Sequence, residues 1–220
     1  MRSPASILPC VLSVFVLITF CLDPASAQPG PQPTLQDLEQ RFQPTFDELA
    51  IQIGTDQLNT SLYLRRAQLY IALARKAYYE RKSGSAYYEK ALADLSTAIG
   101  VDPTAEAYAT RAEIHYQRDP LRSDAEPKAV IDRCLKGYDQ AIADQESAAR
   151  LSEGDSDSAR HYSTLSAYYA NRAQPLAKPE VLAELQARGE KYLPWDDFDR
   201  SIEYAKKANE HAQKLGSWWP

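Results

Sequence analysis

The chain has 220 residues, and its formal net charge is −5. A mildly acidic chain carries no basic footprint for nucleic acid or anionic lipid, so we expect neither as a partner. The length allows one substantial domain and at most two. Charged residues make up 25% and glycine is scarce at 8, a composition that excludes a disordered class and favours helices.

The first 27 residues read as a secretory signal peptide. Arg2 supplies an early positive charge, residues 7–22 are mostly apolar and uncharged, and the small residues at 25–27 offer a cleavage site. The apolar run is shorter than the ~20 residues that span a bilayer comfortably. The alternatives are an uncleaved anchor and a lipoprotein modified at Cys21. We expect an exported protein, periplasmic or extracellular, with no membrane span after signal cleavage.

A linker is predicted between the signal and the folded part. Residues 28–34 alternate proline with other residues, which excludes a helix there, and residues 35–42 suit a short helix. Pro44 fits the first position of another helix, ending near Gly54, that covers the open end of the helical domain. The predicted division is a signal peptide at 1–27, a Pro-rich linker with a short helix at 28–43, and a helical domain at 44–220.

The rest of the chain is organised around an amphipathic helix predicted near 87–103. Ala91, Leu95 and Ala98 fall at i, i+4 and i+7, which places them on one helical stripe. Small residues let one helix approach another closely, so a recurring stripe predicts a stacked helical array rather than one closed enzyme core. The stripe recurs twice, as Ala141, Gln145 and Ala148 and as Ser201, Ala205 and Ala208.

Further helices are predicted between turn signals, and no stretch shows a convincing strand pattern. Their approximate ranges are 56–82, 104–117, 127–151, 156–173, 181–188 and 195–215. Three of these helices carry the string Y-x-x-R-A-[QE], which begins at Tyr63, Tyr108 and Tyr169.

The helix at 87–103 and the one after it resemble tetratricopeptide (TPR) repeats, a family that pairs two helices per unit. Ala112 matches the small position of an opening helix, Ala91 and Ala98 match those of a closing helix, and Pro103 matches the terminal proline. The closing helices recur at wider intervals than the family period of about 34 residues, so the repeats are enlarged and atypical. The resemblance implies an all-α fold, a right-handed array of antiparallel helix pairs forming a TPR-like α-solenoid.

In such arrays the inner face of the opening helices forms a concave groove for a peptide or protein segment. The arginines of the string, Arg66, Arg111 and Arg172, have two interpretations: they bind carboxylates in the groove, or they pair with acids on neighbouring helices. Ala74 and Ala77 are candidates for the first helix crossing. Carried over through the string, the exposed groove candidates are Gln68, Ile71, Glu113, Tyr116, Gln117 and Gln174.

Cysteine usage excludes an intrachain disulfide in the exported form, because Cys10 and Cys21 leave with the signal. Cys134 remains, with apolar neighbours at helical spacing. That setting favours a buried, inert thiol, and the alternative is a reactive thiol or an intermolecular disulfide.

Residues that carry catalytic chemistry are sparse. His115, His161 and His211 belong to no metal or triad motif, and the sequence holds no HExxH, G-x-S-x-G or P-loop. Acid pairs such as Asp196-Asp197 fit favourable charges at a helix N-terminus. We predict no catalytic residue, no metal and no cofactor.

The sequence therefore predicts an exported, non-catalytic protein-interaction scaffold that binds a peptide or protein segment in a concave helical groove. The alternative is a structural subunit of a cell-envelope complex that uses its convex side or its Trp218-Trp219 tail. A third hypothesis is a glycan-binding protein or an enzyme on a helical scaffold.

Overall fold

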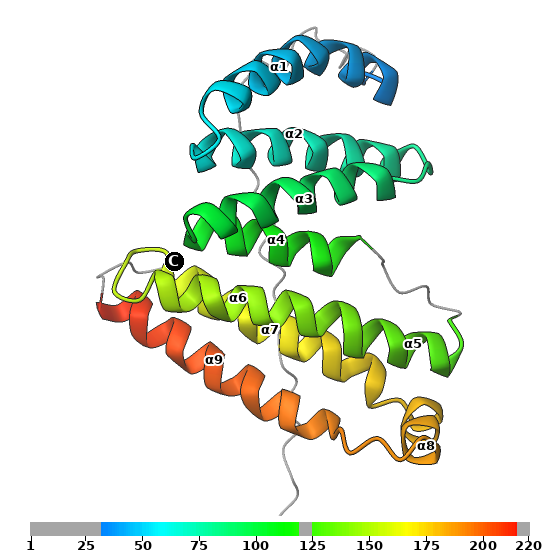
Figure 1. The fold of residues 1–220 in the computed structure, drawn as a ribbon. Helices are drawn as coiled ribbons and strands as arrows, with labels where there is room; N and C mark the ends of the chain where they lie inside the picture. Colours follow the sequence, from blue (N-terminus) through cyan, green and yellow to red (C-terminus); the bar gives the residue numbers. More distant parts are fainter. Residues whose placement is uncertain (1–31, 119–124, 215–220) are drawn as a thin grey trace, which may run out of the picture. The chain divides into compact units, whose positions relative to one another are not determined.

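The computed structural model describes residues 32–118 and 125–214, and those from Pro33 onward belong to one compact unit. Within the described ranges the chain is helical and holds no strand, which confirms the predicted all-α class (Figure 1). The predicted signal peptide and the Trp218-Trp219 tail lie outside the described residues. The helices are α1 (Leu35–Thr55), α2 (Thr60–Tyr79), α3 (Ser85–Val101), α4 (Ala105–Gln117), α5 (Pro127–Arg133), the π-helical η1 (Cys134–Tyr138), α6 (Asp139–Leu151), α7 (Ser158–Leu176), α8 (Pro179–Ala187) and α9 (Pro194–Lys214).

The helices form an array of antiparallel pairs. The opening helix α2 packs against the closing helix α3, α4 packs against α6, and α7 packs against α9. Successive pairs then stack, because α3 also contacts α4 and α6 also contacts α7. α1 covers α2 at one end of the stack, whereas α9 forms the other end (Figure 1). α8 packs against α5.

The two helices predicted on either side of Pro44 are one continuous helix, α1. It begins with a capping box, in which the Thr34 hydroxyl accepts a hydrogen bond from the Asp37 amide and the Asp37 carboxylate accepts one from the Thr34 amide. Pro44 cannot donate to the carbonyl four residues earlier, but it lies on the exposed side of α1, where water can satisfy that carbonyl. Phe42 and Phe46 pack toward α2 from the opposite side.

The long helix predicted at 127–151 is present but contains a π-helical turn, η1. The turn brings the Arg133 guanidinium across Gly137, where a Cβ atom would lie 1.4 Å from Arg133 Nη1. Arg133 Nη2 donates to the carbonyl oxygens of His115 and Tyr116 at 3.1 and 2.7 Å. The end of α4 is therefore tied to the last residue of α5, and a Cβ atom at position 137 would displace the Arg133 guanidinium from this contact.

Small residues fill the crossings between paired helices, as the stripes of the first two closing helices predicted. Ala91, Ala98, Ala141 and Ala148 are all buried. The third stripe was wrong: Ala205 is exposed, because α9 packs against α7 in a different register from the one that the spacing predicted. The buried alanines on the opening helices are Ala67, Ala74, Ala77, Ala107, Ala112 and Ala173.

Candidate functional site

The arginines of the recurring string make the same contact in every helix pair. Arg66 donates from Nε and Nη2 to the two carboxylate oxygens of Asp94, at 2.8 and 2.6 Å. The equivalent pairs lie at nearly identical distances, and in each the aspartate belongs to the closing helix. They are Arg111 with Asp144, at 2.7 and 2.7 Å, and Arg172 with Asp197, at 2.7 and 2.7 Å.

These pairs decide between the two interpretations of the arginines. The carboxylate partners are almost fully buried, and both oxygens of each are already occupied by the guanidinium. The hypothesis that the arginines bind a ligand carboxylate in the groove is therefore wrong. The hydrogen bonds that Arg66 and Arg111 donate to Asp94 and Asp144 raise the pKa of both arginines above the usual value, so both guanidinium groups are charged.

The tyrosine of the string completes each unit. The guanidinium of Arg66 lies 6.0 Å from the ring centre of Tyr63, within range of a cation–π interaction. The two later units repeat this with distances of 5.6 and 5.3 Å. Tyrosine, arginine and aspartate thus form one structural device that fixes how each opening helix lies against its closing helix. The later tyrosine–arginine pairs are Tyr108 with Arg111 and Tyr169 with Arg172.

The opening helices differ in length around this fixed point. α2 has 20 residues, α4 has 13 and α7 has 19. When the three arginines are superposed in sequence, α2 extends about two turns beyond the end of α4, and α7 begins about two turns before the start of α4. Because α4 is shorter than its neighbours α2 and α7, space remains beside it where they extend past its ends. Two cavities lie in these regions.

The first cavity, of about 730 Å³, lies between α4 and α7, and we call it the α4–α7 groove. Ala105, Ala109 and Thr110 form its α4 wall, and their small side chains leave the room. Gln145 of α6 lies at its base, fixed by hydrogen bonds from its amide nitrogen to His161 Nδ1 at 2.9 Å and to the His161 carbonyl at 3.3 Å. The groove is therefore polar at its base and open along α4.

Acidic side chains dominate the α4–α7 groove. Glu106, Glu113, Asp155 and Asp157 line it, and Arg160 is the one guanidinium in its described lining. Arg160 lies 3.5 Å from Asp157, in an exposed pair that screens little of this charge. The groove thus favours a ligand with positive charge.

A second cavity, of about 670 Å³, lies where α2 overhangs the end of α4. Five tyrosines line it, and Tyr116 and Gln117 separate it from the α4–α7 groove because they line both. The Tyr116 ring is held in place, stacked on Tyr168 at 4.8 Å and edge-on to Tyr138 at 5.5 Å. Its hydroxyl accepts a hydrogen bond from Asn171 Nδ2 at 3.0 Å.

The structure brings together half of the predicted groove residues. Glu113, Tyr116 and Gln117 line the α4–α7 groove. Gln68 is exposed on α2 and donates a 3.3 Å hydrogen bond to Glu106, so it adjoins the groove without lining it.

Two predicted residues lie elsewhere. Gln174 is exposed on α7 but lines neither cavity. The prediction of an exposed Ile71 was wrong, because it is buried in the cluster that joins α2, α3 and α4. Its side chain faces the helix packing of the first pair rather than the groove.

The sequence reasoning missed the contribution of α6 and α7 to the groove. Gln145 was assigned to a small-residue stripe, although glutamine at a stripe position was itself a signal of a polar site. Asp155 and Asp157 were interpreted, like Asp196-Asp197, as favourable charges at a helix N-terminus. Thr164 carried no signal in the sequence. These residues reach the groove because α7 begins early and runs beside α4.

The described helices offer neither a metal site nor a membrane span. Across residues 32–118 and 125–214, no cluster of three or more histidine, cysteine or acidic side chains could hold a metal ion. None of the helices in those ranges is long and apolar enough to cross a membrane.

Comparison with known proteins adds little to this geometry. No protein-family model matches the sequence, and no curated protein matches it. Among solved structures, the chain is similar to the crystal structure of MamA, with a TM-score of 0.39 and 16% sequence identity over 82% of this chain and 96% of that chain. A similarity at this level supports no inference about a ligand or partner of the groove.

Proposed function

We propose that this protein is an exported, non-catalytic scaffold of TPR-like helix pairs that binds a segment of a protein partner in the α4–α7 groove. The observation that carries the proposal is the groove itself, an open polar channel between two opening helices. Amide and hydroxyl side chains such as Gln117 and Thr164 suit the hydrogen bonds of an extended backbone. Tyr116, which is half-buried, supplies an aromatic surface beside them.

The partner segment is basic under this proposal. The groove lining holds four carboxylates and one guanidinium, and one of the carboxylates, Glu113, is paired with Arg75 of α2 at 2.6 Å. The other carboxylates still outnumber Arg160, so lysine or arginine side chains of a partner find complementary charge there. Exposed charges are screened by salt, so we expect binding to weaken as ionic strength rises. Export follows from the predicted signal peptide at 1–27, which places the encounter in the periplasm or outside the cell.

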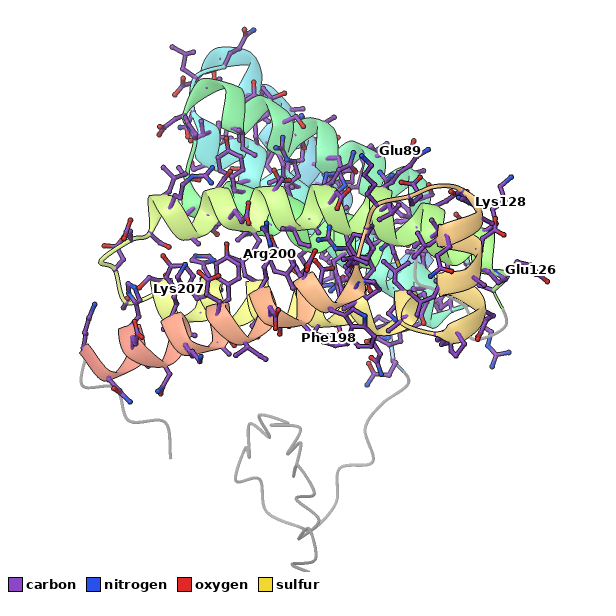
Figure 2. All side chains as sticks on the ribbon, turned by 90° about the horizontal axis from the view of Figure 1, so that it is seen from below. Glu89, Glu126, Lys128, Phe198, Arg200 and Lys207 are labelled. Atoms are coloured by element: carbon purple, nitrogen blue, oxygen red, sulfur yellow. The ribbon has the colours of Figure 1, made fainter. Side chains whose placement is uncertain are left out.

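The experiment begins with peptides selected from a random library on the full chain. The affinity of a selected peptide is then measured by calorimetry for the wild type and for Glu106→Lys combined with Thr110→Arg. Glu106 is exposed and Thr110 lines the open wall, so the double variant blocks and recharges the groove without touching the core. Glu89→Lys is the matched control, because Glu89 is exposed on α3 and lines neither cavity (Figure 2).

We expect basic peptides to be selected, the groove variant to bind at least about tenfold more weakly, and the control to bind like the wild type. Acidic or neutral selected peptides would contradict the charge argument. If the groove variant and the Glu89→Lys control lost peptide affinity equally, the binding surface would lie outside the α4–α7 groove.

The second candidate function is a structural subunit of a cell-envelope complex. One observation favours it: large apolar side chains are exposed on α9, including Trp195 and Ile202. Soluble proteins seldom gather such residues on one surface without a partner. A stoichiometric complex that survives high salt would support this function over the groove.

A further inference from the structure

The outward side of α9 carries a row of apolar residues, which we call the α9 stripe. Trp195, Phe198, Ile202 and Ala205 follow the spacing i, i+3, i+7 and i+10, which keeps them on one side of a helix. Trp195 is 58% exposed and Ile202 is 55% exposed, while Phe198 is half-buried with its ring 6.0 Å from that of Trp195. The α9 stripe is thus a packing surface left open among the described residues.

The arginine–aspartate pairs align α9 with the other closing helices, so they show which residues of α3 correspond to the α9 stripe. Asp197 occupies the place of Asp94 on α3, so Trp195, Phe198 and Ile202 occupy the places of Leu92, Leu95 and Ile99. On α3 these positions pack into a cluster that joins α2 and α3 to Ala107 and Ile114 of α4, the opening helix of the next pair. The α9 stripe therefore continues the established interface between units.

The same relation holds for the second pair. Counted from Asp144, the equivalent residues on α6 are Ile142, Gln145 and Ala149, and all three are buried. Ile142 and Ala149 belong to the cluster that contains Leu165 of α7, and Gln145 bonds to His161 of α7. Each closing helix is thus covered by a following opening helix, except α9, for which the described residues supply none.

The other end of the array does not match the α9 stripe. The exposed side of α1 is mostly polar, with Gln36, Gln40, Gln43 and Asp47 in one row and Ile51 as the large apolar residue beside it. A head-to-tail contact would bury these polar groups against apolar side chains, which is unfavourable. A contact between two copies of the same α9 surface avoids that cost.

Charge on α9 supports an antiparallel contact. Asp199 and Lys206 are both exposed, and their seven-residue spacing places them on the same edge of the α9 stripe. Neither has an ion-pair partner among the described residues. Arg200 and Lys207, by contrast, lie on the opposite side of α9 from Phe198 and are engaged within the chain, with Tyr169 and Glu203 respectively (Figure 2).

We propose that the α9 stripe binds the α9 stripe of a second copy of this chain, antiparallel, with a two-fold axis near Ile202. In that arrangement Asp199 of each copy faces Lys206 of the other, while the apolar side chains of both copies pack in the centre. The contact supplies each terminal pair with the helix that the array lacks. This proposal is independent of the groove and its ligand.

The test is sedimentation equilibrium of the full chain across a concentration range of about 1 to 500 µM. We expect a concentration-dependent dimer. Ile202→Asp should weaken dimerisation about 30-fold or more, as loss of a central apolar contact does in other interfaces. Ile51→Asp is the matched control, because Ile51 is 70% exposed on α1 and should leave dimerisation unchanged.

A charge exchange tests the orientation without touching the apolar residues. Asp199→Lys and Lys206→Asp should each weaken the dimer, because each places like charges opposite one another. The double variant Asp199→Lys with Lys206→Asp should restore it, since the two charges then face each other in reversed order. Failure of the double variant to restore the dimer would overturn the antiparallel pairing.

The same measurements identify results that would overturn the dimer or assign the α9 stripe to another occupant. A wild type that stays monomeric throughout the range overturns the proposal. If that monomer becomes a dimer only after residues 215–220 are removed, the end of the same chain is the occupant instead. A dimer equally weakened by Ile51→Asp and Ile202→Asp would also overturn it, because the interface would not be specific to α9.

Discussion

Arg66 on α2 and Asp94 on α3 are joined by two parallel hydrogen bonds across the first helix pair, although 28 residues separate them in sequence. Both side chains are largely buried, with 23% and 8% of their surfaces exposed. The fork geometry of guanidinium and carboxylate allows one relative position, so the pair sets how far one helix slides along the other. The repeat of this contact in the later pairs gives the whole array one register.

Removing the acid from this pair should destabilise the protein strongly. In Asp94→Asn the Arg66 charge stays in place without its counter-charge, so we expect unfolding free energy to fall by about 2–4 kcal/mol. Urea unfolding followed by circular dichroism measures the change. Arg75→Ala is the control: Arg75 and Glu113 also form a 2.6 Å pair, but both are more than 40% exposed, and the expected loss is below about 1 kcal/mol. Similar losses in both variants would show that burial does not set the value of the Arg66–Asp94 pair.

The sequence predicted the recurring arginines and small-residue stripes of this fold, but not the aspartates that pair with the arginines. The Y-x-x-R-A string and the first two small-residue stripes were visible, because each is local in the chain. The aspartates were not, since the arginine-to-aspartate separation is 28, 33 and 25 residues in the three pairs. The segments between the paired helices differ in length. The same arginine–aspartate contact therefore has a different sequence separation in each pair.

The same variability explains the error in the last helix. Ser201, Ala205 and Ala208 were taken as the third stripe because their spacing matched. The contact of Arg172 with Asp197 shows that Ser201 instead takes the place of Ala98. Spacing alone cannot distinguish two registers that differ by two helical turns, because both place the same residues on nearly the same side.

The groove could be predicted on its α4 side alone. Glu113, Tyr116 and Gln117 follow the string directly, so the resemblance assigned them to a groove, and they line the α4–α7 groove. Asp155 and Asp157 reach the groove only because α7 begins about two turns earlier than α4 relative to the shared arginine. Such a difference in helix length becomes visible only when the helices are superposed in space.

A glycine exchange should distinguish close packing from simple helix propensity. A Cβ atom at Gly84 would lie 2.7 Å from the Ala74 carbonyl oxygen, which is backbone and cannot move aside. Gly84→Ala should therefore cost about 1–3 kcal/mol of unfolding free energy. A Cβ atom at Gly100, inside α3, would meet nothing within 4 Å, so Gly100→Ala should stabilise by about 0.5–1 kcal/mol. Thermal unfolding of both variants checks the opposite signs, and the same sign in both would refute the packing argument.

Cys134 should react only when the protein unfolds. Burial raises the pKa of its thiol to about 12, and its side chain is fully enclosed between α5 and α7. At pH 8 the thiolate fraction is then about a thousandfold below that of an ordinary cysteine, before any effect of steric access. Peptide mapping after iodoacetamide treatment, in native buffer and in urea, follows this residue separately from Cys10 and Cys21. Rapid native labelling of Cys134 would restore the reactive-thiol interpretation.

His161 should make the protein less stable as the pH falls. Burial lowers its pKa below the usual value, and Nδ1 must remain unprotonated to accept the hydrogen bond from the Gln145 amide. The folded state therefore binds fewer protons than the unfolded state, so the stabilisation is complete above the unfolded pKa of about 6.5 and is lost as the pH falls through the lower folded pKa. Urea unfolding at a series of pH values from about 7.5 to 5 measures this loss. In His161→Gln the pH dependence should shrink without vanishing, because burial also lowers the pKa of His115. Curves of identical pH dependence for the wild type and the variant would mean that the buried His161 makes no contribution to it.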